Sequence, residues 1–382
     1  MPKRRSGGRD GGRAAKRQRR HRHNLYLVFD DCLWGYSIRK VDLSSGSYSG
    51  EPPHKHTEAG EKERRLPRAA FRLEARPGYP NYFAAAFGSK IIAMTPHVDT
   101  HAMAPRCAVV PLLDVRTRSF AFAARPKTNL IDPIYFSVDD ERLFALSSGS
   151  FQLLHLSEPE PGGDLCREPE SSWRELPKQP FKREDVASYA IHPDGRTIFV
   201  STKRRTFTFD TGEAQAHLKW KKRHGKWTLP FTGRAYFDSE LDAWVGLNGD
   251  PVAIGHICAC SVASSSNSGS IDGQRLDWKV SKEKLFSEDP VEDHVGATLV
   301  YLGGRSNYCL VQCVSVEDDC IDEELDDETQ PAFRYLFRLT TFSLKFDKRG
   351  HLTTGNSRRV RYYKVPEAAT DFALLEPVAF WM

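Results

Sequence analysis

The feature that most constrains the fold is a strand–turn–strand pattern that recurs along the chain of 382 residues. It is clearest in HPDGRTIFVSTKRRTFTFDTGE (192–213), where Pro-Asp-Gly at 193–195 has turn chemistry. Residues 197–202 then alternate between two faces in the manner of a strand. A basic turn at 203–205 leads into a second strand at 206–209. We therefore predict a β-hairpin here.

The same arrangement recurs, with some variation, in other parts of the chain. The segments are 29–43, 87–94, 138–156, 192–200, 237–247 and 302–316. The first residues after their turns are Tyr36, Ile91, Leu143, Ile198, Ala243 and Tyr308, which are 45 to 65 residues apart. A chain too long for one ordinary core, with short strands repeating about every 50 residues, is typical of a β-propeller. We predict an all-β propeller of six blades, with seven as the alternative.

Smaller motifs resemble those of kelch repeats. Several units end their second strand in an aspartate followed by a turn; these aspartates are Asp42, Asp114, Asp210 and Asp347. The segment LVYLGG (299–304) has a double glycine, and SSWRELPKQPF (171–181) has a tryptophan before Leu-Pro. We expect the glycine pair to permit close strand packing and the aromatic residues to fill the wedge between blades. The predicted fold is thus a kelch-like β-propeller.

The composition divides the chain into two parts. Residues 1–23 contain ten Lys or Arg and one acid, whereas the other 359 residues contain 45 basic and 49 acidic side chains. We predict a disordered basic tail at 1–23 and a propeller domain at 24–382. Polar loop insertions are expected near 51–65, 158–172 and 262–274, together with an acidic loop at 317–328.

The tail carries the clearest functional signal. Its two basic clusters, about ten residues apart, have the layout of a bipartite nuclear import signal read by an import receptor. The candidate residues are Lys3, Arg4, Arg5, Lys16, Arg17, Arg19 and Arg20. The alternatives are a plain solubilising tail and a nonspecific, salt-dependent nucleic-acid contact. The acidic loop is expected to be solvated, although it could also mask the import signal by pairing with the tail.

The sequence contains none of the motifs of common catalytic or cofactor sites, so we predict no catalytic residues and no cofactor. HICAC (256–260) raises the question of a metal, but its spacing does not match the paired ligands of structural zinc sites. We interpret Cys258 and Cys260, like the other cysteines, as core or surface thiols in a reducing compartment. The basic turn at 203–205 is interpreted as a solvated hairpin tip, with a binding role as the alternative. Isolated histidines such as His97, His101 and His192 are expected in turns or at the surface.

The chain also resembles a plant family expanded in grasses, the domain of unknown function 1668. The similarity rests on NLYLVFDDCLWGYSIRKVDL (24–43), YFAAAFGSKIIAM (82–94), WTLPFTGRAYFDSELDAWVGL (227–247) and FALLEPVAFWM (372–382). The resemblance implies a plant intracellular protein with a kelch-like fold. The family has no established activity, so the resemblance assigns no catalytic residues.

These observations favour a noncatalytic protein–protein interaction scaffold or adaptor. We expect it to be a nuclear monomer, with the cytoplasm as the alternative location, that binds an unidentified protein and an import receptor. No run approaches 18 apolar residues and the N-terminus lacks an apolar signal-peptide core, so no membrane association or secretion is expected. Two other functions stay open: nucleic-acid binding through the tail, and catalysis in the propeller channel.

Overall fold

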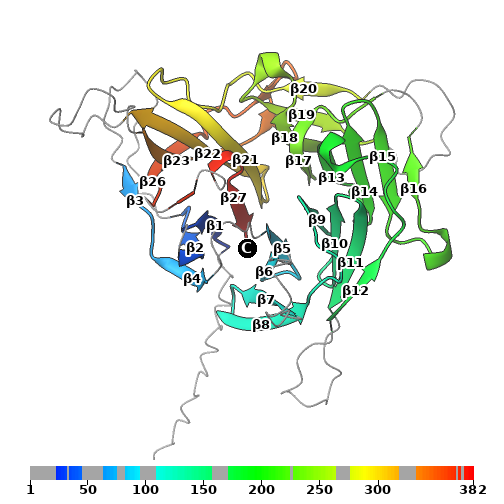
Figure 1. Cartoon of the computed structure of the whole chain (residues 1–382). Coiled ribbons are helices and arrows are strands. Elements are labelled where there is room, and N and C mark those ends of the chain that lie inside the picture. Colours follow the sequence, from blue (N-terminus) through cyan, green and yellow to red (C-terminus); the bar gives the residue numbers. More distant parts are fainter. Residues whose placement is uncertain are drawn as a thin grey trace, which may run out of the picture.

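In this computed structural model, the chain forms a ring of β-sheets around a central axis (Figure 1). The ring divides into six four-stranded antiparallel sheets, of which the fourth and fifth join edge to edge through a parallel pairing and the sixth gains a fifth strand. The structure describes residues 23–31, 34–44, 63–74, 82–94, 109–156, 171–223, 227–263, 276–317, 333–366, 369–370 and 374–382. Each sheet is a blade whose first strand lies nearest the axis and whose fourth lies at the rim. The predictions of an all-β propeller and of six blades are confirmed.

The strands of the first three blades, from the axis outward, are as follows. Blade 1 contains β27 (Val378–Trp381), β1 (Leu25–Asp30), β2 (Tyr36–Val41) and β4 (Ala69–Leu73). Blade 2 contains β5 (Tyr82–Ala86), β6 (Lys90–Met94), β7 (Val109–Asp114) and β8 (Ser119–Ala124). Blade 3 contains β9 (Ile134–Ser137), β10 (Arg142–Ser147), β11 (Ser150–Leu156) and β12 (Ser171–Glu175).

The other three blades follow the same plan. Blade 4 contains β13 (Val186–Ile191), β14 (Thr197–Thr202), β15 (Thr206–Asp210) and β16 (Trp220–Lys222). Blade 5 contains β17 (Phe231–Asp238), β18 (Ala243–Asn248), β19 (Ile257–Ser261) and β20 (Trp278–Val280), and its first strand pairs in parallel with β13. Blade 6 contains β21 (Asp293–Gly303), β22 (Asn307–Glu317), β23 (Phe333–Ser343) and β26 (Arg359–Lys364).

Smaller elements lie outside the six blades. A hairpin of β24 (Lys345–Phe346) and β25 (Leu352–Thr353) extends from blade 6. Three 3₁₀ turns lie in connections: η2 (Arg183–Asp185), η3 (Gln215–His217) and η4 (Pro251–Ala253). Within the described ranges, no helix is long and apolar enough to cross a membrane.

The hydrophobic core is divided among the junctions between blades. Six clusters of buried side chains each join two neighbouring blades, in the order 1–2, 2–3, 3–4, 4–5, 5–6 and 6–1. Strand β14 shows why, because Ile198 and Val200 enter the junction with blade 3 while Phe199 enters the junction with blade 5. Successive side chains of a strand point to opposite faces, so a blade between two neighbours buries both. This explains the continuously apolar second strands.

Tryptophan side chains bind across these junctions. The indole N–H of Trp173 in blade 3 donates to the carbonyl oxygen of Ala124 in blade 2, at 2.7 Å. The indole of Trp244 in blade 5 donates to the carbonyl oxygen of Ile191 in blade 4, at 3.0 Å. The expectation that aromatic residues fill the wedges is therefore confirmed at these two positions, with a hydrogen bond added to the packing.

Two devices close the ring between blades 6 and 1. The C-terminal strand β27 supplies the innermost strand of blade 1 and pairs antiparallel with β1. The connection between β2 and β4 reaches across the junction, where β3 (Arg64–Arg65) adds a parallel strand to the rim of blade 6. Glu63 there pairs with Arg334 and Lys364, and these contacts hold the pKa of its carboxyl below the usual value despite partial burial. His23, the last residue of the tail predicted at 1–23, stacks on Trp381 and so contacts the ring.

The closure corrects the repeat derived from the sequence. Ile91, Leu143, Ile198, Ala243 and Tyr308 lie in second strands, as equivalent positions should, but Tyr36 begins the third strand of blade 1. The equivalent strand of blade 1 is β1, whose Leu25 and Leu27 face the preceding blade. The predicted repeat was placed one strand too late in blade 1, because the inner strand of this blade comes from the other end of the chain.

Two further expectations change. The glycine pair of 299–304 does not serve close packing, since a Cβ on Gly303 or Gly304 would meet nothing within 4 Å. Gly303 instead adopts a positive φ of 76° in the turn after β21. The loops predicted at 51–65 and 158–172 run into the short strands β3 and β12, whose polar rim positions lack an apolar signal. Most of both segments, of 262–274 and of 317–328 lies outside the described residues.

A buried carboxylate joins blades 5 and 6. Asp238 is fully buried, and its Oδ1 accepts the backbone N–H groups of Glu240 (3.0 Å) and Leu241 (3.2 Å). The hydroxyl of Ser306 donates to the same oxygen at 2.9 Å. The phenol of Tyr308 donates to Oδ2 at 2.7 Å, and its pKa is raised by burial and by the neighbouring carboxylate.

We predict that Tyr308→Phe lowers the free energy of unfolding by about 1–3 kcal/mol, because the buried carboxylate loses a donor that water cannot replace. Chemical denaturation measures this change. Tyr301→Phe is the matched control, since Tyr301 lies on the adjacent strand and makes none of the bonds to Asp238. Equal losses in the two variants would contradict the assigned role of the hydrogen bond.

Candidate functional site

The topology gives the ring two different faces. The inner strands run in the same direction, so the first-to-second and third-to-fourth strand connections of each blade reach one face, here called the turn face. The second-to-third connections and the links between blades reach the opposite face, here called the loop face. The two faces differ in chemistry.

The turn face is held by aspartates that fold back on their own backbone. Asp114, Asp139 and Asp194 each accept two backbone N–H groups from residues two and three positions later. Burial alone would raise the pKa of the Asp194 carboxyl, but bonds from Thr197 and the amide of Arg196 outweigh it and the pKa is lowered. The aspartate turns expected from the sequence are confirmed at Asp114 and also at Asp210, which accepts the N–H of Gly212. Their polar atoms are already occupied.

The loop face instead exposes large apolar side chains. Six residues in its connections are 53% to 93% exposed, and they come from blades 1 and 5 and from three links between blades. They are Trp34, Ile131, Val252, Ile254, Val291 and Leu375. Large apolar side chains exposed on the connections of one face are candidates for contact with a partner. The sequence reading did not find this surface.

Two of these side chains, Val252 and Val291, lie in turns with the same sequence, Asp-Pro-Val. The carboxylate of Asp250 accepts the N–H of Val252 at 3.0 Å, and that of Asp289 accepts the N–H of Val291 at 3.1 Å. The intervening proline fixes its own φ, so both valines are presented in a defined orientation. The repeated tripeptide was the signal in the sequence that could have located them.

Polar side chains from several blades meet at the inner strands. Arg183 Nε donates to the carbonyl oxygen of Asp132 at 2.7 Å, and the N–H of Asp132 donates to the hydroxyl of Tyr82 at 3.3 Å. The guanidinium of Arg234 lies over the ring of Tyr236, 4.8 Å from its centre. The first two contacts join parts of different blades, the third lies within β17, and none of them pairs a nucleophile with a base. Nowhere in the described residues do three His, Cys, Asp or Glu groups lie close enough to hold a metal ion.

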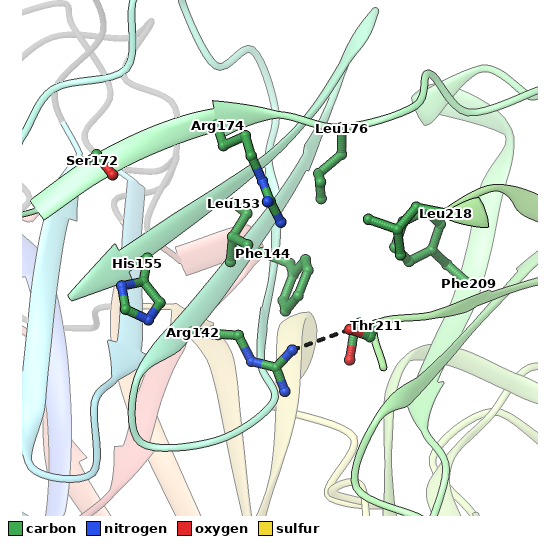
Figure 2. A pocket seen from close by; sticks show the side chains of 10 residues that line it. All are labelled: Arg142, Phe144, Leu153, His155, Ser172, Arg174, Leu176, Phe209, Thr211 and Leu218. Atoms are coloured by element: carbon green, nitrogen blue, oxygen red, sulfur yellow. Dashed lines mark hydrogen bonds between the residues drawn. The ribbon is translucent and has the colours of Figure 1, made fainter. Parts of the chain in front are cut away.

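A small cavity of about 250 Å³ lies between blades 3 and 4 at the turn face (Figure 2). Its apolar lining consists of Phe144, Leu153, Leu176, Phe209 and Leu218. Its polar lining consists of Arg142, His155, Ser172, Arg174 and Thr211. The volume lies below the roughly 300–1,000 Å³ typical of small-molecule sites. It is suited to a single side chain or a small group.

The charged side chains around this cavity have partners within the ring. Arg142 binds the carboxylate of Asp139 at 2.6 Å and the carbonyl oxygen of Thr211 at 3.2 Å, the bond drawn in Figure 2. Arg174 donates to the side chain of Gln215 at 3.2 Å, and His155 lies 3.8 Å from a carboxylate of Glu141. Asp139 thus neutralises Arg142, whereas Arg174 keeps its positive charge beside a neutral amide. Because the cavity is small, the loop face is the better candidate site.

The residues predicted from the sequence are distributed as follows. The import-signal candidates Lys3 to Arg20, His97, His101 and the acidic run beyond Glu317 lie outside the described residues. The basic turn at 203–205 is exposed on the loop face, and the hydroxyl of Thr202 accepts its N–H groups. His192 lies in a turn as expected, but its ring packs on Phe199 at 5.7 Å.

The thiols expected in the core lie there. Cys258 and Cys260 are buried between blades 4 and 5, and Cys309 and Cys313 between blades 6 and 1. Burial raises the pKa of the Cys309 and Cys313 thiols to about 12. For Cys260, burial and the nearby Asp277 carboxylate do the same, to about 12.

With this geometry established, comparison with protein families is decisive. A family model described as "Protein of unknown function (DUF1668)" matches residues 22–363. The chain belongs to this family. The matched region includes every strand of the DUF1668 ring except β27 and the last residue of β26. None of the curated proteins compared with the chain matches it.

Solved structures show only distant similarity to this DUF1668 protein. AztD from Citrobacter koseri is 10% identical, with a TM-score of 0.38 over 90% of this chain and 98% of its own. TolB from Acinetobacter baumannii is 12% identical, with a TM-score of 0.34 over 78% and 68%. The Cps50 (Swd1) β-propeller domain of Myceliophteria thermophila is 12% identical, with a TM-score of 0.29 over 48% and 55%. The strand order, and not these scores, defines the propeller.

We predict that the four buried thiols resist alkylation in the native protein, because a raised pKa leaves almost no thiolate at about pH 8. Iodoacetamide treatment followed by peptide mass spectrometry should leave Cys258, Cys260, Cys309 and Cys313 unmodified until guanidinium is added. Lys203→Cys, in the exposed turn, is the control that should react in the folded state. Fast native labelling of any of the four would contradict their placement.

Proposed function

We propose that this protein is a noncatalytic scaffold that binds another protein through its loop face. The observation that carries the proposal is that six large apolar side chains are exposed on the connections of that face, two of them in Asp-Pro-Val turns. Recognition sites are commonly built on loops that a rigid framework positions. The closed ring provides such a framework.

The chemistry of the loop face defines the kind of partner. Separated apolar tips suit a broad protein surface with several shallow apolar depressions, since isolated anchors gain most when buried in pockets of the partner. The exposed cations at 203–205 add a basic margin, which favours a partner with acidic groups at the corresponding edge. The binding is therefore assigned to a folded protein partner.

We predict that the double variant Val252→Lys/Val291→Lys reduces capture of loop-face partners by about tenfold or more, because binding would bury two unpaired ammonium groups. Full-length protein and variant, immobilised in parallel, are compared for the proteins they retain from a nuclear extract. Phe346→Lys is the matched control, since it places the same charge at an exposed apolar site away from the loop face. Unchanged retention by the double variant, with an unchanged melting temperature, would refute the proposed site.

We further propose that the basic segment at the N-terminus directs the protein into the nucleus by binding an import receptor. The support is its charge pattern, two Lys/Arg clusters in a segment poor in acids. The described ring is a poor alternative carrier of such a signal, because residues 24–382 contain more acidic than basic side chains.

We predict that Lys16→Ala/Arg17→Ala/Arg19→Ala/Arg20→Ala lowers the nuclear-to-cytoplasmic ratio of a fluorescent full-length fusion severalfold. The matched control removes the basic cluster of the loop face by changing Lys203, Arg204 and Arg205 to alanine, which should leave the ratio unchanged. A ratio that survives loss of the tail cluster would reject the import signal. Salt-sensitive retention on immobilised DNA, lost in the same tail variant, would point instead to a nucleic-acid contact.

A further inference from the structure

The rim of blade 2 presents an unusual free strand. Strand β8 is the outermost strand of this blade and lies at the periphery of the ring in Figure 1. A rim strand leaves one backbone edge unpaired, and proteins commonly protect such an edge with charged side chains or a covering segment. Among the described rim strands, β8 alone has neither.

The other described rim strands have charged side chains or a covering strand at their outer edge. Their charged residues are Arg72 on β4, Arg174 and Glu175 on β12, Lys221 and Lys222 on β16, and Lys279 on β20. The fourth strand of blade 6, β26, is covered by β3. The sequence of β8, SFAFAA, contains no charged side chain at all. Within the described residues, its edge is thus open to pairing with another strand from Ser119 to Ala123.

The direction of its backbone groups can be derived from the end of the strand. The N–H of Ala124 donates to the hydroxyl of Ser171 at 2.6 Å, and its carbonyl oxygen accepts the indole N–H of Trp173. Both partners belong to blade 3, so the polar groups of Ala124 point away from β7. Alternate residues of a strand direct these groups the same way, so those of Phe120 and Phe122 also point outward. They have no partner among the described residues.

The same two residues supply an apolar surface. Phe120 is 53% exposed and Phe122 is 43% exposed, and Phe120 makes an edge-to-face contact with Phe71 of blade 1 at 5.6 Å. Ala121 and Ala123 occupy the opposite side and pack in the cluster between blades 2 and 3. A strand added to β8 would therefore bond to the backbone of both phenylalanines and cover their rings.

Charge at the two ends of β8 identifies the occupant. Residues 115–131 contain four basic side chains and no acidic one. Arg116 and Arg118 are exposed at the turn-face end, and Lys127 is exposed beyond the other end. A segment with acidic residues on both sides of a short apolar stretch complements this distribution. A second copy does not, because antiparallel self-pairing would bring the basic ends of two β8 strands together.

We propose that β8 is a second binding site, which takes an extended segment of another protein as an added strand, with acidic residues flanking β-branched apolar ones. Main-chain hydrogen bonds to Phe120 and Phe122 provide the affinity, and the phenylalanine rings select apolar side chains on one side of the added strand. The site lies on the rim of the ring, away from the loop face, and does not depend on the function proposed for that face.

The test uses the full-length protein and a fluorescein-labelled peptide, Asp-Glu-Val-Thr-Val-Thr-Val-Asp-Glu, followed by fluorescence anisotropy. The peptide should bind, and its analogue with proline at the central valine should not. Phe122→Lys should raise the Kd by about tenfold or more, because it places a charge on the edge. Phe122→Pro should act similarly without loss of a bond to β7, since the N–H that it removes points outward. Trp278→Lys on the rim strand β20 is the matched control and should leave the Kd unchanged.

Hydrogen exchange adds a residue-level readout. Without peptide, the amides of Phe120 and Phe122 should exchange faster than those of Ala121 and Ala123, and peptide should slow the first pair. Binding that is unchanged in Phe122→Lys, or reduced equally in Trp278→Lys, overturns the proposal. So does self-association without peptide binding that Phe122→Lys abolishes, which would identify a second copy as the occupant. The variant Val252→Lys/Val291→Lys should bind the peptide normally, so failure of the loop-face proposal is separately visible.

Discussion

Apolar packing between neighbouring blades is the interaction on which the rest of the structure depends. The ring has no single central core, and each junction buries side chains from two blades. A blade on its own would expose both of its apolar faces to water, so the arrangement is stable only when the circle is complete. The ring is closed in two places: β27 completes blade 1, and β3 pairs with the outer strand of blade 6.

The same packing leaves the two faces free to specialise. Side chains that stabilise the ring point sideways into the junctions, and the connections at either end contribute little to them. On the turn face, aspartates use their carboxylates to hold short turns, which leaves few polar atoms for a ligand. On the loop face, the Asp250 and Asp289 carboxylates perform the same local task but present a valine outward. The same aspartate turn thus stabilises the turn face and, on the loop face, positions an exposed valine.

The sequence was sufficient for the parts of the fold that depend on local pattern. Hairpins with apolar strands and Gly or Asp turns revealed the second strands of five blades, and the six-bladed ring followed. The sequence did not predict the inner strands separately, because segments such as β9 and β5 are only four and five residues long, too short to show a clear periodic pattern. Contacts between distant residues were also beyond local pattern: Asp238 and Tyr308 are 70 positions apart. The loop-face valines were missed because an exposed apolar residue has no periodic signature, although their shared tripeptide is visible afterwards.

Closure of blade 1 by β27 also bears on how the protein is made. Strand β27 follows every other strand of the ring in the chain, yet its partner β1 is the first to be synthesised. On the ribosome the nascent chain must therefore remain an open arc, with apolar surface uncovered at both free ends. Chaperones that bind exposed apolar surface would bind this arc. They would dissociate when the last strand pairs with β1 and covers that surface.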